Sequence, residues 1–264
     1  MAVEKLTSTT LTAALTENVN DFYVASTSGV TVGDYLVCRA EAMKVQEVPS
    51  STQVRVARGV NGTAARAHPA SAVVYVGSPE KFQAIKDSLT AIVGDSGAYP
   101  DFLLPGQRAM DSAGNEYILL ELTEVVYTGV TVMIEPGLAF HAFPPTLLGG
   151  RNGSVALAVD AGTSDQYIWG QIYGYNSYAQ TAIAGTSAYA PEVQASATTP
   201  KVGMSPQLVA DNQDSIYQIY GMFITGGATT GSASSSRVAY SVPVWLNYPY
   251  MTNYGSVLGT SGGA

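Results

Sequence analysis

The chain has 264 residues and a net charge of −8, and only 12% of its residues are charged, about half the usual share. Hydrophobic residues make up 46%, which excludes a disordered chain, and the acidic balance gives no electrostatic footprint for nucleic acid. The single cysteine excludes an internal disulfide. We expect neither a membrane helix nor a secretory leader, because no apolar run is long enough.

The first 77 residues predict short strands separated by turns. Val54 and Val56 alternate with Arg55, which predicts a strand with one buried face. Asn61-Gly62 is typical of a tight turn. Strands recur about every ten residues, which indicates a small sandwich or barrel. The strands are expected over residues 22–26, 34–40, 42–48, 53–60 and 71–77.

Residues 78–94 predict a helix. Ser78 is suited to the N-cap, Pro79 to the first helical position and Gly94 to the C-terminal stop. We interpret the helix as a connector between two modules. Its apolar residues keep helical spacing at Phe82, Ile85, Leu89 and Ile92.

Residues 95–264 predict a second, larger β-module, either a barrel or a sandwich. Residues 107–111 and 116–122 flank a turn sequence, and 154–161 pairs with 166–175 in the same way. Charge also divides the chain. Residues 1–86 carry eight Lys and Arg against seven Asp and Glu, whereas residues 87–264 carry four against thirteen. The expected fold is therefore all-β, with modules at 1–77 and 95–264 joined by the helix.

Catalytic and metal-binding patterns are missing from the sequence. His68 lies in a turn and His141 among apolar residues, and neither belongs to a recognisable triad. Zinc-binding spacings and phosphate-binding glycine loops are absent. Residues 111–116 (DSAGNE) faintly resemble a calcium loop, but a plain turn explains them better. We therefore expect a protein that is not an enzyme and has no cofactor or metal.

Aromatic residues form the first candidate contact set. Alternation places Tyr167, Trp169, Tyr173 and Tyr175 on one face of a strand, and Tyr248 and Tyr250 add a second cluster near the C-terminus. These side chains suit either a packed core or a subunit interface. A sugar-binding platform is the alternative.

Basic residues of the first module form the second candidate set. They either are ordinary surface charges or dock against an acidic partner. The set consists of Arg39, Lys44, Arg55, Arg58 and Arg66.

Two parts of the chain resemble proteins of tailed-bacteriophage particles. Residues 26–45 (STSGVTVGDYLVCRAEAMKV) and 54–77 (VRVARGVNGTAARAHPASAVVYVG) resemble a block common in phage virion proteins. Four segments resemble capsid decoration, or cement, proteins more loosely: residues 106–122 (GQRAMDSAGNEYILLEL), 154–161 (SVALAVDA), 169–175 (WGQIYGY) and 242–250 (VPVWLNYPY).

The resemblance implies a non-catalytic protein on the outside of a phage capsid. Its partners would be the major capsid protein and further copies of itself in a homotrimer, without nucleic acid or membrane. On our own hypothesis, the near-neutral first module, with its basic stretch, faces the shell, and the aromatic residues form the oligomer interface. Charge reversal at Arg55 and Arg58 is then expected to abolish shell binding without unfolding the protein. A tail or fibre component that binds host glycans and a tail-tube or adaptor protein stay open as alternatives.

Overall fold

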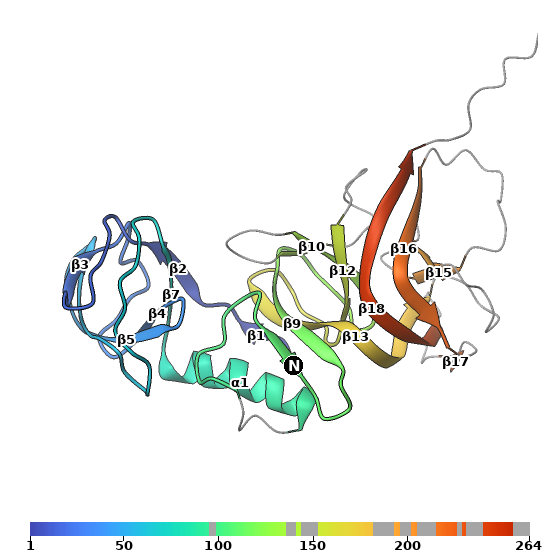
Figure 1. Cartoon of the computed structure of the whole chain (residues 1–264), viewed down its shortest axis with the longest axis horizontal. Helices are drawn as coiled ribbons and strands as arrows, with labels where there is room; N and C mark the ends of the chain where they lie inside the picture. The colour runs from blue at the N-terminus through green and yellow to red at the C-terminus, as the bar shows by residue number, and fades with distance from the viewer. Residues whose placement is uncertain are drawn as a thin grey trace, which may run out of the picture. The chain divides into compact units, whose positions relative to one another are not determined.

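The computed structural model describes residues 1–94, 99–135, 141–143, 153–181, 193–195, 202–204, 215–225, 229–230 and 240–255 (Figure 1). It divides into two compact units. The first is Val3–Leu104, and the second contains the chain from Pro105 onward together with Met1–Ala2. Both units are built from β-strands, which confirms the all-β, two-module fold. The boundary places the helix inside the first unit, whereas the sequence pattern suggested a connector.

The first unit contains a six-stranded antiparallel sheet with the order β2-β7-β4-β5-β6-β3. A bridge between Leu11 and Val24 joins its two ends, as does the amide of Ala25, which donates to the Thr10 carbonyl at 2.9 Å. The sheet therefore closes into a small barrel. The strands of this unit are β1 (Val3–Glu4), β2 (Thr7–Thr10), β3 (Asp21–Tyr23), β4 (Tyr35–Cys38), β5 (Glu41–Ser50), β6 (Gln53–Ala57) and β7 (Val73–Gly77).

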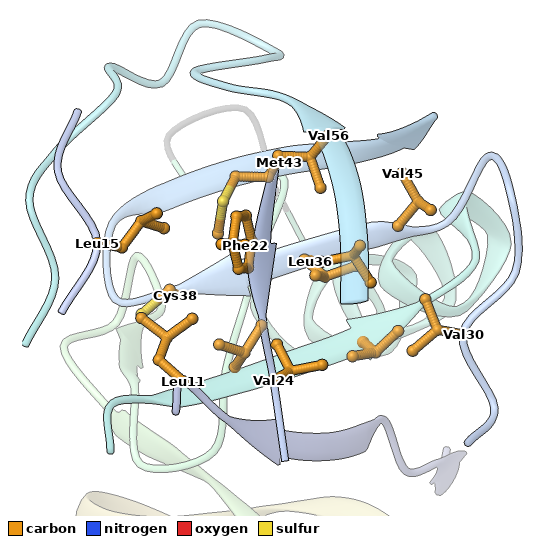
Figure 2. Close-up of a cluster of buried hydrophobic side chains, with 13 residues drawn as sticks. Leu11, Leu15, Phe22, Val24, Val30, Leu36, Cys38, Met43, Val45 and Val56 are labelled. Carbon is orange, nitrogen blue, oxygen red and sulfur yellow. The ribbon is translucent and has the colours of Figure 1, made fainter. Parts of the chain in front are cut away.

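The apolar side chains in the barrel interior come from β3, β4, β5, β6 and β7 and from the segments that flank the strands. Figure 2 shows Phe22, Leu36, Met43 and Val56 pointing toward one another in its centre. Val54 and Val56 are buried while Arg55 is exposed, so the alternation predicted for β6 is confirmed. Cys38 is also part of this core and is fully buried.

The predicted helix is confirmed as α1 (Pro79–Val93). Gly94 ends it in the left-handed conformation, at φ 79°, and its amide donates to the Thr90 carbonyl at 2.9 Å. Ser78 occupies the N-cap position, although its side chain makes no capping hydrogen bond. Phe82 packs edge-on against Phe102, with ring centroids 5.1 Å apart, and this contact helps to fix the helix within the first unit.

The second unit consists of one extensively paired sheet. Its strand order is β13-β15-β14-β16-β18-β12-β10-β11-β9-β8, and β17 lies against β18. The long strand β13 also pairs with β9, β12 and β18, so the sheet folds back on itself. The strands are β8 (Arg108–Met110), β9 (Glu116–Leu122), β10 (Thr131–Glu135), β11 (His141–Phe143), β12 (Gly153–Ala158), β13 (Gln166–Thr181), β14 (Val193–Ala195), β15 (Val202–Met204), β16 (Ser215–Ile224), β17 (Thr229–Thr230) and β18 (Tyr240–Gly255).

The core of the second unit gathers aliphatic side chains from β9, β10, β12 and β13. Ile168 and Ile172 point into it from β13, opposite the aromatic residues that alternate with them. Gly170 lies between the two isoleucines because a β-carbon there would approach a Leu120 methyl group to 2.6 Å. The predicted pairing of 154–161 with 166–175 is confirmed by the register Leu157 to Gln171.

Candidate binding surfaces

Three of the five predicted basic residues are exposed and carry no carboxylate partner among the described residues: Arg39, Lys44 and Arg66. Arg39 lies in the turn between β4 and β5, and Lys44 faces outward on β5. Arg66 lies in the loop between β6 and β7, and its amide donates to Glu41 at the start of β5. Arg39 and Arg66 therefore share one end of the barrel.

Arg55 is exposed, but two carboxylates already compensate its charge. Its Nη1 lies 2.6 Å from Glu47 Oε2, and its Nη2 lies 3.3 Å from Asp21 Oδ2. These three residues stand side by side on β5, β6 and β3. The row contains two exposed ion pairs of small energetic value, and they leave little free positive charge for a partner.

The prediction that Arg58 is a surface contact is wrong. Its side chain is only 4% exposed, and its Nε and Nη2 donate to the two oxygens of Glu41 at 2.5 and 2.7 Å. The remaining donors reach the carbonyls of Thr16, Val19 and Arg66 at 2.7 to 2.9 Å. The guanidinium thus ties three segments together inside the unit. Reversing its charge would destabilise the fold, contrary to the sequence-based expectation.

Glu41 is the centre of this network, and its side chain is fully buried. Besides Arg58 it accepts from the Arg66 amide at 3.0 Å and the Gly59 amide at 3.3 Å, and its Oε2 lies 2.8 Å from His68 Nε2. Burial alone would raise the pKa of this carboxyl, but the hydrogen bonds from Arg58, His68 and Arg66 lower it below its usual value. His68 accordingly has a structural role, because it is buried beside the Glu41–Arg58 ion pair and contacts Glu41.

The aromatic stripe on β13 divides into a buried and an exposed part. Tyr167 and Trp169 are fully buried within the unit, so the prediction that these two residues form an oligomer interface is wrong. They belong to the stretch of β13 that pairs with β9, where both faces of the strand are covered. Tyr173 is half-buried, and Tyr175 is 49% exposed.

Toward the C-terminal end of β13, exposed aromatic rings from β13, β16 and β18 come together. Tyr175 lies opposite Trp245 on β18, and Trp245 lies opposite Phe223 on β16. Directly opposed residues point to the same face of a sheet, so these three rings form a row. Figure 1 shows β16 and β18 as long neighbouring strands. We call the set Tyr173, Tyr175, Phe223, Trp245 and Tyr248 the aromatic surface.

Three of the five rings of the aromatic surface, Tyr173, Trp245 and Tyr248, hold one another in place. Tyr173 stacks on Tyr248 with centroids 5.3 Å apart and meets Trp245 edge-on at 5.9 Å. The Arg108 guanidinium lies 5.8 Å from the centre of the Tyr248 ring. The Tyr248 hydroxyl donates to Glu116 at 2.8 Å, and this bond raises the pKa of the tyrosine. Arg108 and Glu116 are themselves 3.9 Å apart.

Tyr250 is exposed but lies outside the aromatic surface, opposite Ser154 on β12 and Tyr220 on β16. Sequence reasoning missed Trp245 and Phe223 as members of the surface. The signal for Trp245 was present, because it alternates with the buried residues Val244 and Leu246.

Segment 111–116 forms the plain turn that the sequence indicated. Asp111 accepts from the amides of Ala113 and Asn115, the Asn115 side chain and the Tyr117 hydroxyl, so the turn itself occupies this carboxylate. Among the described residues, no group of three His, Cys, Asp or Glu side chains could hold a metal ion. His141 pairs with Glu135 through the backbone, and its side chain lies outside the described residues.

No described helix is long and apolar enough to span a membrane. Comparison with protein-family models, with curated proteins and with solved structures gives no match for this chain.

Proposed function

We propose that the chain is a structural virion protein that binds the outside of an assembled phage capsid and stabilises it, without catalysis. The resemblance of residues 26–45 and 54–77 to phage virion proteins supports this proposal. Both segments belong to the first unit, so the barrel is the proposed shell-facing part. The looser resemblance of residues 106–122, 154–161, 169–175 and 242–250 to capsid decoration proteins supports assembly as a homotrimer, with the major capsid protein as the partner.

One observation carries the proposal. Arg39, Lys44 and Arg66 are exposed on the barrel without carboxylate partners among the described residues, whereas Arg55 and Arg58 are neutralised within the unit. Unpaired cations raise the rate of encounter with an acidic surface and select it over others. The contact set is therefore reduced from five basic residues to these three.

The proposed mechanism is stabilisation by mass action. A protein that binds the assembled shell, and not its free subunits, favours the assembled state by RT ln(1 + [L]/Kd) at each site. Many sites on one lattice make the effect collective, so modest affinity at each site suffices. Electrostatic contacts of this kind weaken as ionic strength rises, since the screening length falls from about 10 Å at 0.1 M salt to about 3 Å at 1 M.

The test is binding of purified protein to undecorated heads of the encoding phage, measured by co-sedimentation. The variant R39Q/K44Q/R66Q removes the three unpaired charges, and we expect its affinity for heads to fall at least tenfold. The matched control is R55Q, which removes a charge that is already paired and should bind like the wild type. Equal binding of the triple variant and the wild type would contradict the assignment of the docking surface.

A further inference from the structure

We propose that the aromatic surface binds an uncharged oligosaccharide that lies across β13, β18 and β16. This site would add a second activity to the protein, and it does not depend on capsid binding. It rests on four features of the described residues: the spacing of the rings, the kind of side chain exposed, the charge of the surface and the fixed position of the rings.

The spacing of the rings suits a chain of sugars. Tyr175, Trp245 and Phe223 stand on three adjacent strands, each directly opposite the next. Opposed side chains on neighbouring strands begin about 5 Å apart, so the row extends over about 10 Å. That distance matches two or three linked pyranose rings, each of which could lie against one aromatic side chain.

The large hydrophobic side chains that are exposed on these strands are of one kind. On the described parts of β13, β16 and β18, every large hydrophobic side chain that is exposed is aromatic. The aliphatic residues Met222, Val244 and Leu246 point to the opposite, buried face. An aromatic face is electron-rich, so it attracts the polarised C–H groups on the flat side of a sugar more than an aliphatic side chain does. Stacking on the flat face of a sugar is therefore the contact that this row of rings offers.

The charge of the surface favours a neutral ligand. Arg108 and Glu116 are its charged neighbours, and they offset each other at 3.9 Å. Together with the exposed Asn247, which lies opposite Tyr173, they offer donors and acceptors for sugar hydroxyls. Residues 105–264 carry four Lys and Arg against ten Asp and Glu, and this excess repels acidic glycans and nucleic acid.

Three of the rings, Tyr173, Trp245 and Tyr248, are already in position before a ligand arrives. Tyr173 is fixed between Tyr248 and Trp245, and Tyr248 is fixed by its hydrogen bond to Glu116. Side chains that are ordered in the free protein lose little conformational entropy on binding, which leaves more of the stacking energy for affinity. Binding to these preorganised rings therefore loses little conformational entropy.

The test uses a microarray of uncharged glycans, followed by titration of the full-length protein with the linear hexasaccharides of glucose, galactose, mannose and N-acetylglucosamine. We expect at least one neutral glycan to bind, with a blue shift of the tryptophan fluorescence. Trp245 is half-exposed while Trp169 is buried, so the shift would report on Trp245 alone. The variant W245A should bind at least tenfold more weakly, and W245F should keep most of the affinity.

The matched control is Y127A, because Tyr127 is an exposed aromatic residue of the same unit outside the aromatic surface. It should bind glycan like the wild type. If W245A does not fold, Y175A removes a neighbouring ring and replaces it in the test. The proposal is overturned if no uncharged glycan binds, or if W245A and Y175A bind like the wild type. It is also overturned if these substitutions instead convert an oligomer to a monomer, because the surface is then an interface between copies.

Discussion

Replacing Glu41 by alanine should unfold the barrel more readily than any other single loss of charge in the first unit. The substitution leaves the Arg58 guanidinium buried without its counter-ion, and it also removes the acceptor for the amides of Gly59 and Arg66. Removing one partner of a buried ion pair costs about 3–5 kcal/mol. Since whole domains are stable by only about 5–15 kcal/mol, the variant should keep the barrel folded with a small margin or lose it.

The assay follows Cys38, the only cysteine of the chain, which lies in the barrel core. Thiol labelling in increasing urea therefore reports on the unfolding of the first unit. Tryptophan fluorescence reports on the second unit, because both tryptophans belong to it. The control is Glu47→Ala, which breaks the exposed pair with Arg55 and should cost less than about 1 kcal/mol. A Glu41→Ala variant whose urea midpoint equals that of Glu47→Ala would refute the assignment of Glu41 as the centre of the barrel's buried network.

Three further predictions concern pH, the thiol and two glycines. Hydrogen bonding lowers the pKa of Glu41 below its usual value of 4.5. The stabilising contribution of its charge is therefore complete above pH 4.5 and is lost as the pH falls through the lowered pKa. In urea titrations at acid pH, the free energy of unfolding of Glu41→Gln should depend less on pH than that of the wild type. Burial raises the pKa of the Cys38 thiol to about 11, so the native protein should react with a thiol reagent at pH 8 far more slowly than the protein unfolded in urea, and equal rates would show that the barrel core is open. Gly33→Ala and Gly174→Ala impose a side chain at similar positive φ, 97° and 96°, which costs about 1–2 kcal/mol. A β-carbon at Gly174 would also come within 2.0 Å of Asn115 Oδ1, whereas a β-carbon at Gly33 meets nothing within 4 Å. We therefore expect Gly174→Ala to lower the urea midpoint of the second unit, followed by tryptophan fluorescence, by more than Gly33→Ala lowers that of the first unit, followed by Cys38 labelling.

Local patterns predicted much of the fold. The alternation in β6, the turn at Asn61-Gly62 and the limits of α1 depend on neighbouring residues, and each of these signals was present in the sequence. Asn61 and Gly62 both adopt positive φ, 53° and 77°, as a tight turn of this composition requires.

The candidate sites depended on contacts between distant residues, and here the sequence was insufficient. Arg58 is buried because it pairs with Glu41, 17 positions earlier, at the start of the neighbouring strand β5. Tyr167 and Tyr175 follow the same alternation, yet Tyr167 is buried and Tyr175 is exposed. Alternation predicts the face of the strand on which a side chain lies, but not whether another part of the chain covers that face. The stacking of Tyr173 on Tyr248 joins strands 75 positions apart and leaves no local signal.

The proposed function requires that the protein recognise the assembled shell and not its free subunits. The most direct measurement is its occupancy on undecorated heads, compared with its binding to free capsid subunits at the same subunit concentration. We expect that heads saturate at a fixed number of copies and resist heating better, while free subunits bind the protein much more weakly. Equal binding to free subunits, or no saturable binding to heads, would contradict it.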